Sequence, residues 1–111
     1  MKRSILVIAF ICLVLRCAAV AYARAQFTLE NRINKQLNLF VDGAYACGPV
    51  MTNGGICTTQ ITSGVVHKFE ARAGMDPNTT VMTQTRSVPD GASPTMVVCY
   101  LDPKTGRCPG S

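Results

Sequence analysis

Short segments rich in Val, Ile, Thr, Phe and Tyr recur along the chain and are separated by Gly, Pro, Asn and Asp, a pattern typical of an all-β domain. No window has a convincing helical period. Seven short strands predict a small antiparallel β-sandwich rather than an open sheet. The segments expected as strands are Phe27 to Asn31, Gln36 to Asp42, Tyr45 to Val50, Ile56 to Ile61, Val65 to Ala71, Thr79 to Val88 and Thr95 to Leu101.

Two of these segments indicate which side chains point inward, because apolar and polar residues alternate with a period of two. We expect the apolar members to form the core and the polar members to face solvent. Asp42-Gly43 between two segments predicts a two-residue hairpin turn. The residues expected inside are Leu37, Leu39, Val41, Val65, Phe69 and Ala71, and those expected outside include Asn38, Lys68, Glu70 and Arg72.

The first residues have the pattern of a secretory signal peptide: Lys2 and Arg3, an apolar run from Ile5 to Leu15, then small residues ending in Ala23-Arg24-Ala25. Cleavage after Ala25 is expected, which leaves one domain over residues 26–111. The apolar run is about half of the roughly 20 residues that span a bilayer. Arg16 also disfavours lipidation at the next residue, Cys17. We therefore expect a secreted or periplasmic protein without stable membrane insertion after cleavage.

The charge of the chain is concentrated in this leader. The full sequence has a net charge of +5, but removal of residues 1–25 leaves seven basic and six acidic side chains, a net charge of +1. The remaining basic residues form no cluster and are not interleaved with aromatic ones, so nucleic-acid binding has no support.

Four cysteines remain after the leader, an even number in an exported chain, which favours two disulfides. Three pairings are possible. We prefer Cys47 with Cys57 and Cys99 with Cys108, because each pair brackets a turn-rich loop whose ends a hairpin would already bring together. Nine and eight residues lie between the partners, whereas structural zinc sites and thioredoxin-type sites use closer spacings. A metal or redox site is the less favoured alternative.

The sequence offers little for catalysis. His67 is the only histidine, and it falls in register with the core face, where a partly buried histidine hydrogen-bonded to a neighbouring loop is expected more than a catalytic base. The Asp residues stand in turn contexts and form no calcium-ligand loop. We expect no enzyme activity, no metal and no cofactor. Asn78-Thr79-Thr80 fits the glycosylation pattern, and residues 79–87 form either a solvated strand or an edge strand able to accept a partner strand.

The segment from Leu37 to Phe69 resembles the PEGA-type repeat, a small extracytoplasmic β-sandwich module. The shared pattern is a strand ending in Val41-Asp42-Gly43, a second ending in Gly48-Pro49, and Ile61 followed by Ser63-Gly64 and His67. The resemblance implies a structural His67 and a binding or scaffolding module rather than an enzyme.

These observations predict a non-catalytic binding or structural module that recognises a protein or a cell-envelope polymer. The alternative is a small inhibitor or immunity-type protein that presents a disulfide-bracketed loop to a partner enzyme, since closure of the loop reduces the entropy lost on binding. The oligomeric state stays open. The residues of the candidate partner-binding loop are Gly48, Pro49, Val50, Met51, Thr52, Asn53, Gly54, Gly55 and Ile56.

Overall fold

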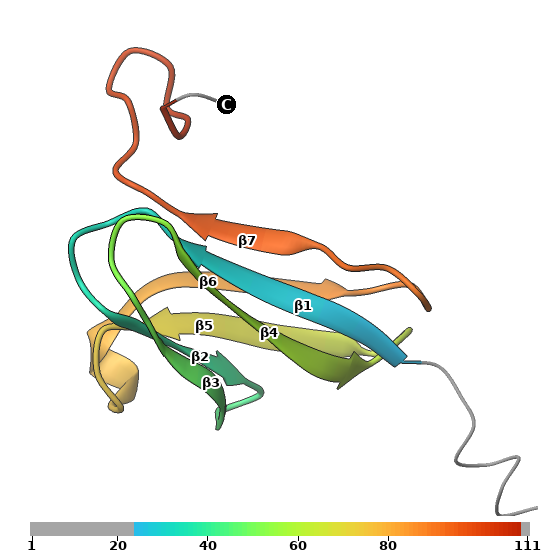
Figure 1. Ribbon diagram of the computed structural model, residues 1–111. Coiled ribbons are helices and arrows are strands. Elements are labelled where there is room, and N and C mark those ends of the chain that lie inside the picture. Colours follow the sequence, from blue (N-terminus) through green and yellow to red (C-terminus); the bar gives the residue numbers. More distant parts are fainter. Residues whose placement is uncertain (1–23, 110–111) are drawn as a thin grey trace, which may run out of the picture.

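The structure is a computed structural model that describes residues 24–109. Within these residues, seven strands and one short 3-10 helix form two sheets packed face to face (Figure 1), which confirms the predicted sandwich and its seven short strands. Most of the expected signal peptide, residues 1–23, lies outside the described residues. The elements are β1 (Arg24–Asn31), β2 (Leu37–Val41), β3 (Ala44–Val50), β4 (Gly55–Thr62), β5 (Val66–Arg72), η1 (Pro77–Thr79), β6 (Thr80–Ser87) and β7 (Thr95–Val98).

One sheet has the strand order β4-β1-β7 and the other has the order β3-β2-β5-β6. All pairs are antiparallel except β1 with β7, which run parallel. No hairpin dictates the direction of this pair, because the chain leaves β6, crosses between the sheets and then follows β1. The pairing already begins before β7, since the backbone N–H groups of Gln26 and Thr28 donate to the carbonyls of Ala92 and Pro94, each at 3.0 Å.

The core lies between the two sheets and is centred on two stacked aromatic rings. The rings of Phe27 on β1 and Phe69 on β5 are stacked, with centroids 3.7 Å apart and planes that are nearly parallel. The predicted inward positions on β2 are confirmed, because Leu37 and Leu39 are fully buried and Val41 packs against the core. β2 therefore directs toward the core the side chains that its apolar alternation predicts.

On β5 the prediction is wrong at three positions. Val65 precedes the strand and is exposed, while Glu70 and Arg72, expected in solvent, are buried on the outer face of the sheet. The guanidinium of Arg72 lies 3.9 Å from the centroid of the Phe40 ring, and its Nη2 donates to Oε1 of Glu70 at 3.1 Å. The cation–π contact and the ion pair let both charged groups lie against the sheet, so alternation alone could not place them.

Both preferred disulfides are present, Cys47–Cys57 with a Cα–Cα distance of 6.2 Å and Cys99–Cys108 with one of 5.7 Å. The expectation that the first pair closes a hairpin is wrong, because β3 and β4 belong to different sheets. Val50 is buried in the core, and residues 51–54 then cross the end of the sandwich. The first disulfide consequently ties the two sheets together along one side.

Candidate functional site

Three loops gather at one end of the sandwich because three strands of one sheet meet there. Asn31, the last residue of β1, pairs with Gly55 at the start of β4 and with Val98 at the end of β7. Figure 1 shows the connections that leave these strands on the same side of the molecule. We call this region the cysteine-loop end and define it as residues 32–36, 48–56 and 99–108.

The buried side chain of Asn31 joins two of these loops, residues 32–36 and 48–56, through hydrogen bonds to their backbone. Its side chain is fully buried, and its Nδ2 donates to the carbonyl of Lys35 at 2.7 Å and to that of Val50 at 3.1 Å. Its Oδ1 accepts the backbone N–H of Ile33 at 3.0 Å. A buried amide with both ends satisfied fixes the backbone around it. Asn31 was not among the predicted site residues, although it continues the inward positions of Phe27 and Leu29 and is therefore a polar residue at a core position.

The loop between Cys47 and Cys57 is fixed along its backbone as well. The N–H groups of Asn53 and Gly54 donate to the carbonyls of Ile33 and Asn31, and both residues have positive φ, 58° and 113°. A Cβ on Gly55 would lie 2.4 Å from the carbonyl oxygen of Met51, so this position requires glycine. The predicted binding loop is therefore a rigid segment rather than a mobile one.

Only part of the predicted loop is available to a partner. Val50 faces the core, whereas the side chains of Met51 and Ile56 are 58% and 63% exposed. Gln36 donates a hydrogen bond from Nε2 to Sδ of Met51 at 3.6 Å, which places the methionine beside the first loop. The exposed members of the predicted loop are Pro49, Met51, Asn53, Gly54 and Ile56, and the half-buried members are Gly48, Thr52 and Gly55.

The second cysteine loop joins the same end, which the sequence analysis did not anticipate. The hydroxyl of Tyr100 donates to Oδ1 of Asn34, and the N–H of Arg32 donates to the carbonyl of Val98 at 2.8 Å. Tyr100 and Leu101 expose most of their side chains, and a hollow of about 200 Å³ beside them is lined by Arg32, Cys99, Tyr100 and Pro109. Both disulfide-closed segments thus contribute apolar surface to one end of the molecule.

The charge of this end differs from that of the whole domain. It carries four basic side chains and one acidic one, while the complete described chain is close to balanced. Glu30 on β1 offsets one of them through an ion pair with Arg32. This end therefore combines exposed apolar side chains with an excess of basic ones. The charged residues are Arg32, Lys35, Lys104, Arg107 and Asp102.

His67 lies toward the opposite end and matches the expectation of a buried histidine bonded to neighbouring turns. Its Nδ1 is 2.6 Å from Oδ2 of Asp42, and its Nε2 is 2.8 Å from the carbonyl oxygen of Thr62. The hydrogen bond to Asp42 raises the pKa of His67, burial opposes this, and the Thr62 carbonyl adds to it. The same pair holds the pKa of Asp42 below its ordinary value, helped by the N–H of Lys68. Both neighbours accept hydrogen bonds, so the doubly protonated imidazolium fits this site best.

Asp42 can occupy this position because of the hairpin turn. Its φ is 52° and that of Gly43 is 82°, which confirms the predicted two-residue turn. Oδ1 of Asp42 accepts the N–H of Lys68 at 2.9 Å while Oδ2 meets the imidazole. These contacts of Asp42 fasten the β2–β3 turn to β5 and occupy Nδ1 of His67, while the carbonyl of Thr62 occupies Nε2.

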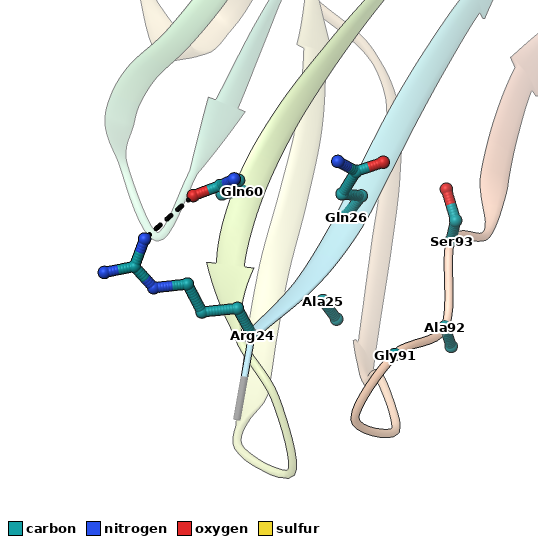
Figure 2. A pocket seen from close by; sticks show the side chains of 7 residues that line it. All are labelled: Arg24, Ala25, Gln26, Gln60, Gly91, Ala92 and Ser93. Carbon is teal, nitrogen blue, oxygen red and sulfur yellow. Dashed lines mark hydrogen bonds between the residues drawn. The ribbon is translucent and has the colours of Figure 1, made fainter. Parts of the chain in front are cut away.

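Two hollows lie near this opposite end. One, of about 370 Å³, is bordered by β3, β4 and His67. The other, of about 260 Å³, is shown in Figure 2, where Arg24 reaches across β4 and donates from Nη1 to Oε1 of Gln60 at 3.1 Å. The second hollow is lined by Arg24, Ala25, Gln26, Gln60, Gly91, Ala92 and Ser93, a set without a carboxylate, thiol or imidazole.

Over residues 24–109 no group of three or more His, Cys, Asp or Glu side chains is arranged to hold a metal ion. In the same part of the chain, no helix has the length and apolar character needed to cross a membrane. Comparisons with family models, with curated proteins and with solved structures find no match for this chain. The resemblance of Leu37 to Phe69 to PEGA-type modules stays a prediction.

Proposed function

We propose that this protein is an exported, non-catalytic binding module whose recognition surface is the cysteine-loop end. The observation that carries the proposal is the pre-ordered backbone there: two disulfides and the buried side chain of Asn31 fix three loops that expose Met51 and Tyr100. Binding through pre-ordered loops loses less conformational entropy than binding through mobile ones. Two intramolecular disulfides are typical of an oxidising compartment, which supports secretion or a periplasmic location.

The partner we propose is a protein or an envelope polymer with acidic groups. The loops of this end carry four basic side chains and one acidic side chain beside their exposed apolar residues in sequence, and complementary charge favours association and selects among partners. The alternative, an inhibitor that inserts the loop from Gly48 to Ile56 into an enzyme cleft, fits the geometry less well. The tip of that loop, Asn53-Gly54, is hydrogen-bonded against residues 31 and 33 and so does not project freely.

Capture from native extracellular or periplasmic extract tests this function. Immobilised wild type, Met51→Ser and Met75→Ser are compared, because the two methionines are almost equally exposed, 58% and 60%, and lie in different loops. We expect Met51→Ser to lose the captured partner and Met75→Ser to retain it. A second pair, Arg107→Ser against Arg86→Ser, tests the charge. Equal capture by all four variants and the wild type would refute recognition through this end.

A further inference from the structure

The asparagine at position 78 belongs to the only Asn-X-Ser/Thr pattern in the sequence, Asn78-Thr79-Thr80. Its middle residue is not proline, so the pattern is the one that accepts an N-linked glycan in secreted proteins. The chain therefore offers a single position for this modification, and it lies outside the cysteine-loop end. The other asparagines, Asn31, Asn34, Asn38 and Asn53, are followed two residues later by Ile, Gln, Phe and Gly.

The fold exposes Asn78 on the connection between two strands. Residues 73–79 link β5 to β6 and include η1, in which no residue is buried. The side chain of Asn78 is exposed and makes no hydrogen bond or ion pair within residues 24–109. Asn31, Asn34 and Asn38, by contrast, use their side chains in hydrogen bonds. A bulky hydrophilic group can therefore be attached to Asn78 without the loss of a contact in the fold.

The two threonines of the pattern hold this connection in place. Oγ1 of Thr79 donates to the carbonyl of Asp76 at 2.6 Å. The N–H of Thr80 donates to the carbonyl of Pro77, and Oγ1 of Thr80 lies 2.7 Å from the same carbonyl oxygen. Oγ1 of Thr80 also lies 3.1 Å from Oε2 of Glu70 on β5. The connection does not depend on the asparagine, so the unmodified chain should fold to the same structure.

The hydroxyl of Thr80 indicates when Asn78 is accessible to a transferase. Ser and Thr share a side-chain hydroxyl, which explains why either residue completes the acceptor pattern. In the folded protein Thr80 is half-buried and its hydroxyl is hydrogen-bonded to Pro77 and Glu70. A transferase that recognises this hydroxyl therefore reaches it before β6 has paired with β5.

We propose that Asn78 carries an N-linked glycan that is attached during export, before the connection between β5 and β6 has folded. The donor is an oligosaccharide joined through C1 to a lipid pyrophosphate. Nδ2 of Asn78 attacks C1, so that the Nδ2–C1 bond forms and the bond between C1 and the pyrophosphate oxygen breaks. Nδ2 loses one proton, and the lipid pyrophosphate leaves with the electron pair. The proposal rests on export, which is one part of the proposed function, and does not require the recognition surface.

The attachment site lies at one edge of the four-stranded sheet. β6 begins two residues after Asn78 and is the last strand in the order β3-β2-β5-β6. The strand at the opposite edge, β3, carries Cys47 and its disulfide to β4. The glycan is therefore attached at the edge away from the Cys47–Cys57 bond, so glycosylated protein remains suitable for the capture experiment.

Peptide mass spectrometry of the exported, disulfide-bonded protein tests the proposal. The protein is isolated from native extracellular material and, in parallel, from secretory cells that make the lipid-linked donor and express the full chain with its own leader. We expect the peptide that contains Asn78 to carry sugar mass, which an amidase specific for N-linked glycans removes. Asn78→Gln and Thr80→Val should lose this mass completely. Thr80→Ser, which retains the hydroxyl, and Asn34→Gln, a change at an exposed asparagine outside the pattern, should keep it.

Exported wild type without sugar on Asn78, from either source, would overturn the proposal, as would sugar mass that persists in Asn78→Gln. A chain that is not exported would refute export together with the modification, whereas an exported and unmodified chain would refute the modification alone. A second measurement tests the timing. Membranes that contain the transferase and the lipid-linked donor should glycosylate the reduced, unfolded chain and leave the folded wild type unmodified. Equal modification of the two forms would contradict attachment before folding.

Discussion

Replacement of Asn31 by Ala tests the main structural premise of the proposed binding surface, namely that one buried amide fixes two of its loops. The substitution removes three hydrogen bonds to the backbone groups of Lys35, Val50 and Ile33. The two bonds to Val50 and Ile33 are buried, so their backbone partners lose their hydrogen bonds away from water. Each such group costs about 1–3 kcal/mol. We expect the free energy of unfolding to decrease by about 3 kcal/mol, because relaxation of the backbone, or a water molecule that enters the site, recovers part of this cost.

This loss is large for so small a domain, because total stabilities are about 5–15 kcal/mol. It corresponds to a decrease in Tm of about 12–24 °C for a domain of this size. Asn31→Asp should be at least as damaging at neutral pH, because a carboxylate oxygen would face the carbonyls of Lys35 and Val50. That repulsion raises the pKa of the new carboxyl in the folded state, so the stability of this variant should begin to decrease above about pH 4 and continue to decrease up to the raised folded-state pKa.

Urea unfolding of the wild type, Asn31→Ala and the control Asn78→Ala measures the effect. Asn78 is an exposed residue in η1, and its substitution should change the free energy of unfolding by less than about 0.5 kcal/mol. Amide exchange gives a local readout, since the N–H of Ile33 loses its acceptor in the Asn31 variant. A loss below about 1 kcal/mol, together with unchanged exchange at Ile33, would refute the assigned role of Asn31.

Three further predictions concern the His67–Asp42 contact, the first disulfide and the first residue of the mature chain. The free energy of unfolding should decrease as pH rises from 6 to 8. The raised pKa of His67 stabilises the fold fully below about pH 6.5, and this contribution is lost as pH rises through the folded-state pKa. Asp42→Asn, which tolerates the same positive φ, should make the free energy of unfolding less dependent on pH, as measured by urea titrations at fixed pH values. Replacing both Cys47 and Cys57 by Ser should lower the free energy of unfolding by about 3 kcal/mol, the value of the chain-entropy model. Urea unfolding measures this change, and a decrease smaller than about 1 kcal/mol would contradict the prediction. Intact mass of the protein after signal cleavage should place its first residue at Gln26, as cleavage after Ala25 requires; a mature chain that begins at another residue would contradict this.

The strand segments could be predicted from sequence because their determinants are local. Asp42-Gly43 sets a turn by its positive φ values, and apolar alternation sets the inward face of β2. The disulfide partners followed from the even number of cysteines and from the turn-rich loop that each pair brackets, although no hairpin closes the first loop. Each of these signals acts within about ten residues, so a single sequence contains it.

The arrangement of the loops could not be predicted, because it depends on pairs that are far apart in the chain. The parallel pairing of β7 with β1 brings the second cysteine loop to residues 32–36, and the crossing at residues 51–54 makes the first disulfide a link between sheets. Asn31 alternates with the inward-facing Phe27 and Leu29 on β1, but the acceptors that satisfy its amide come from two other segments. The polar side chain of Asn31 at a core position was therefore the one signal in the sequence that this residue holds loops in place.

Different interactions stabilise the two ends of the sandwich, so stability and binding affinity should depend differently on pH. The end near His67 depends on a contact between an imidazole and the carboxylate of Asp42, whereas the cysteine-loop end depends on two disulfides and an uncharged amide. The only histidine lies outside the cysteine-loop end, and histidine is the side chain whose charge ordinarily changes between pH 5 and 8. We therefore expect the affinity for the captured partner to stay constant between pH 6 and 8 while the stability of the fold decreases. Affinity that decreases in parallel with stability would show that the partner contacts the His67 end instead.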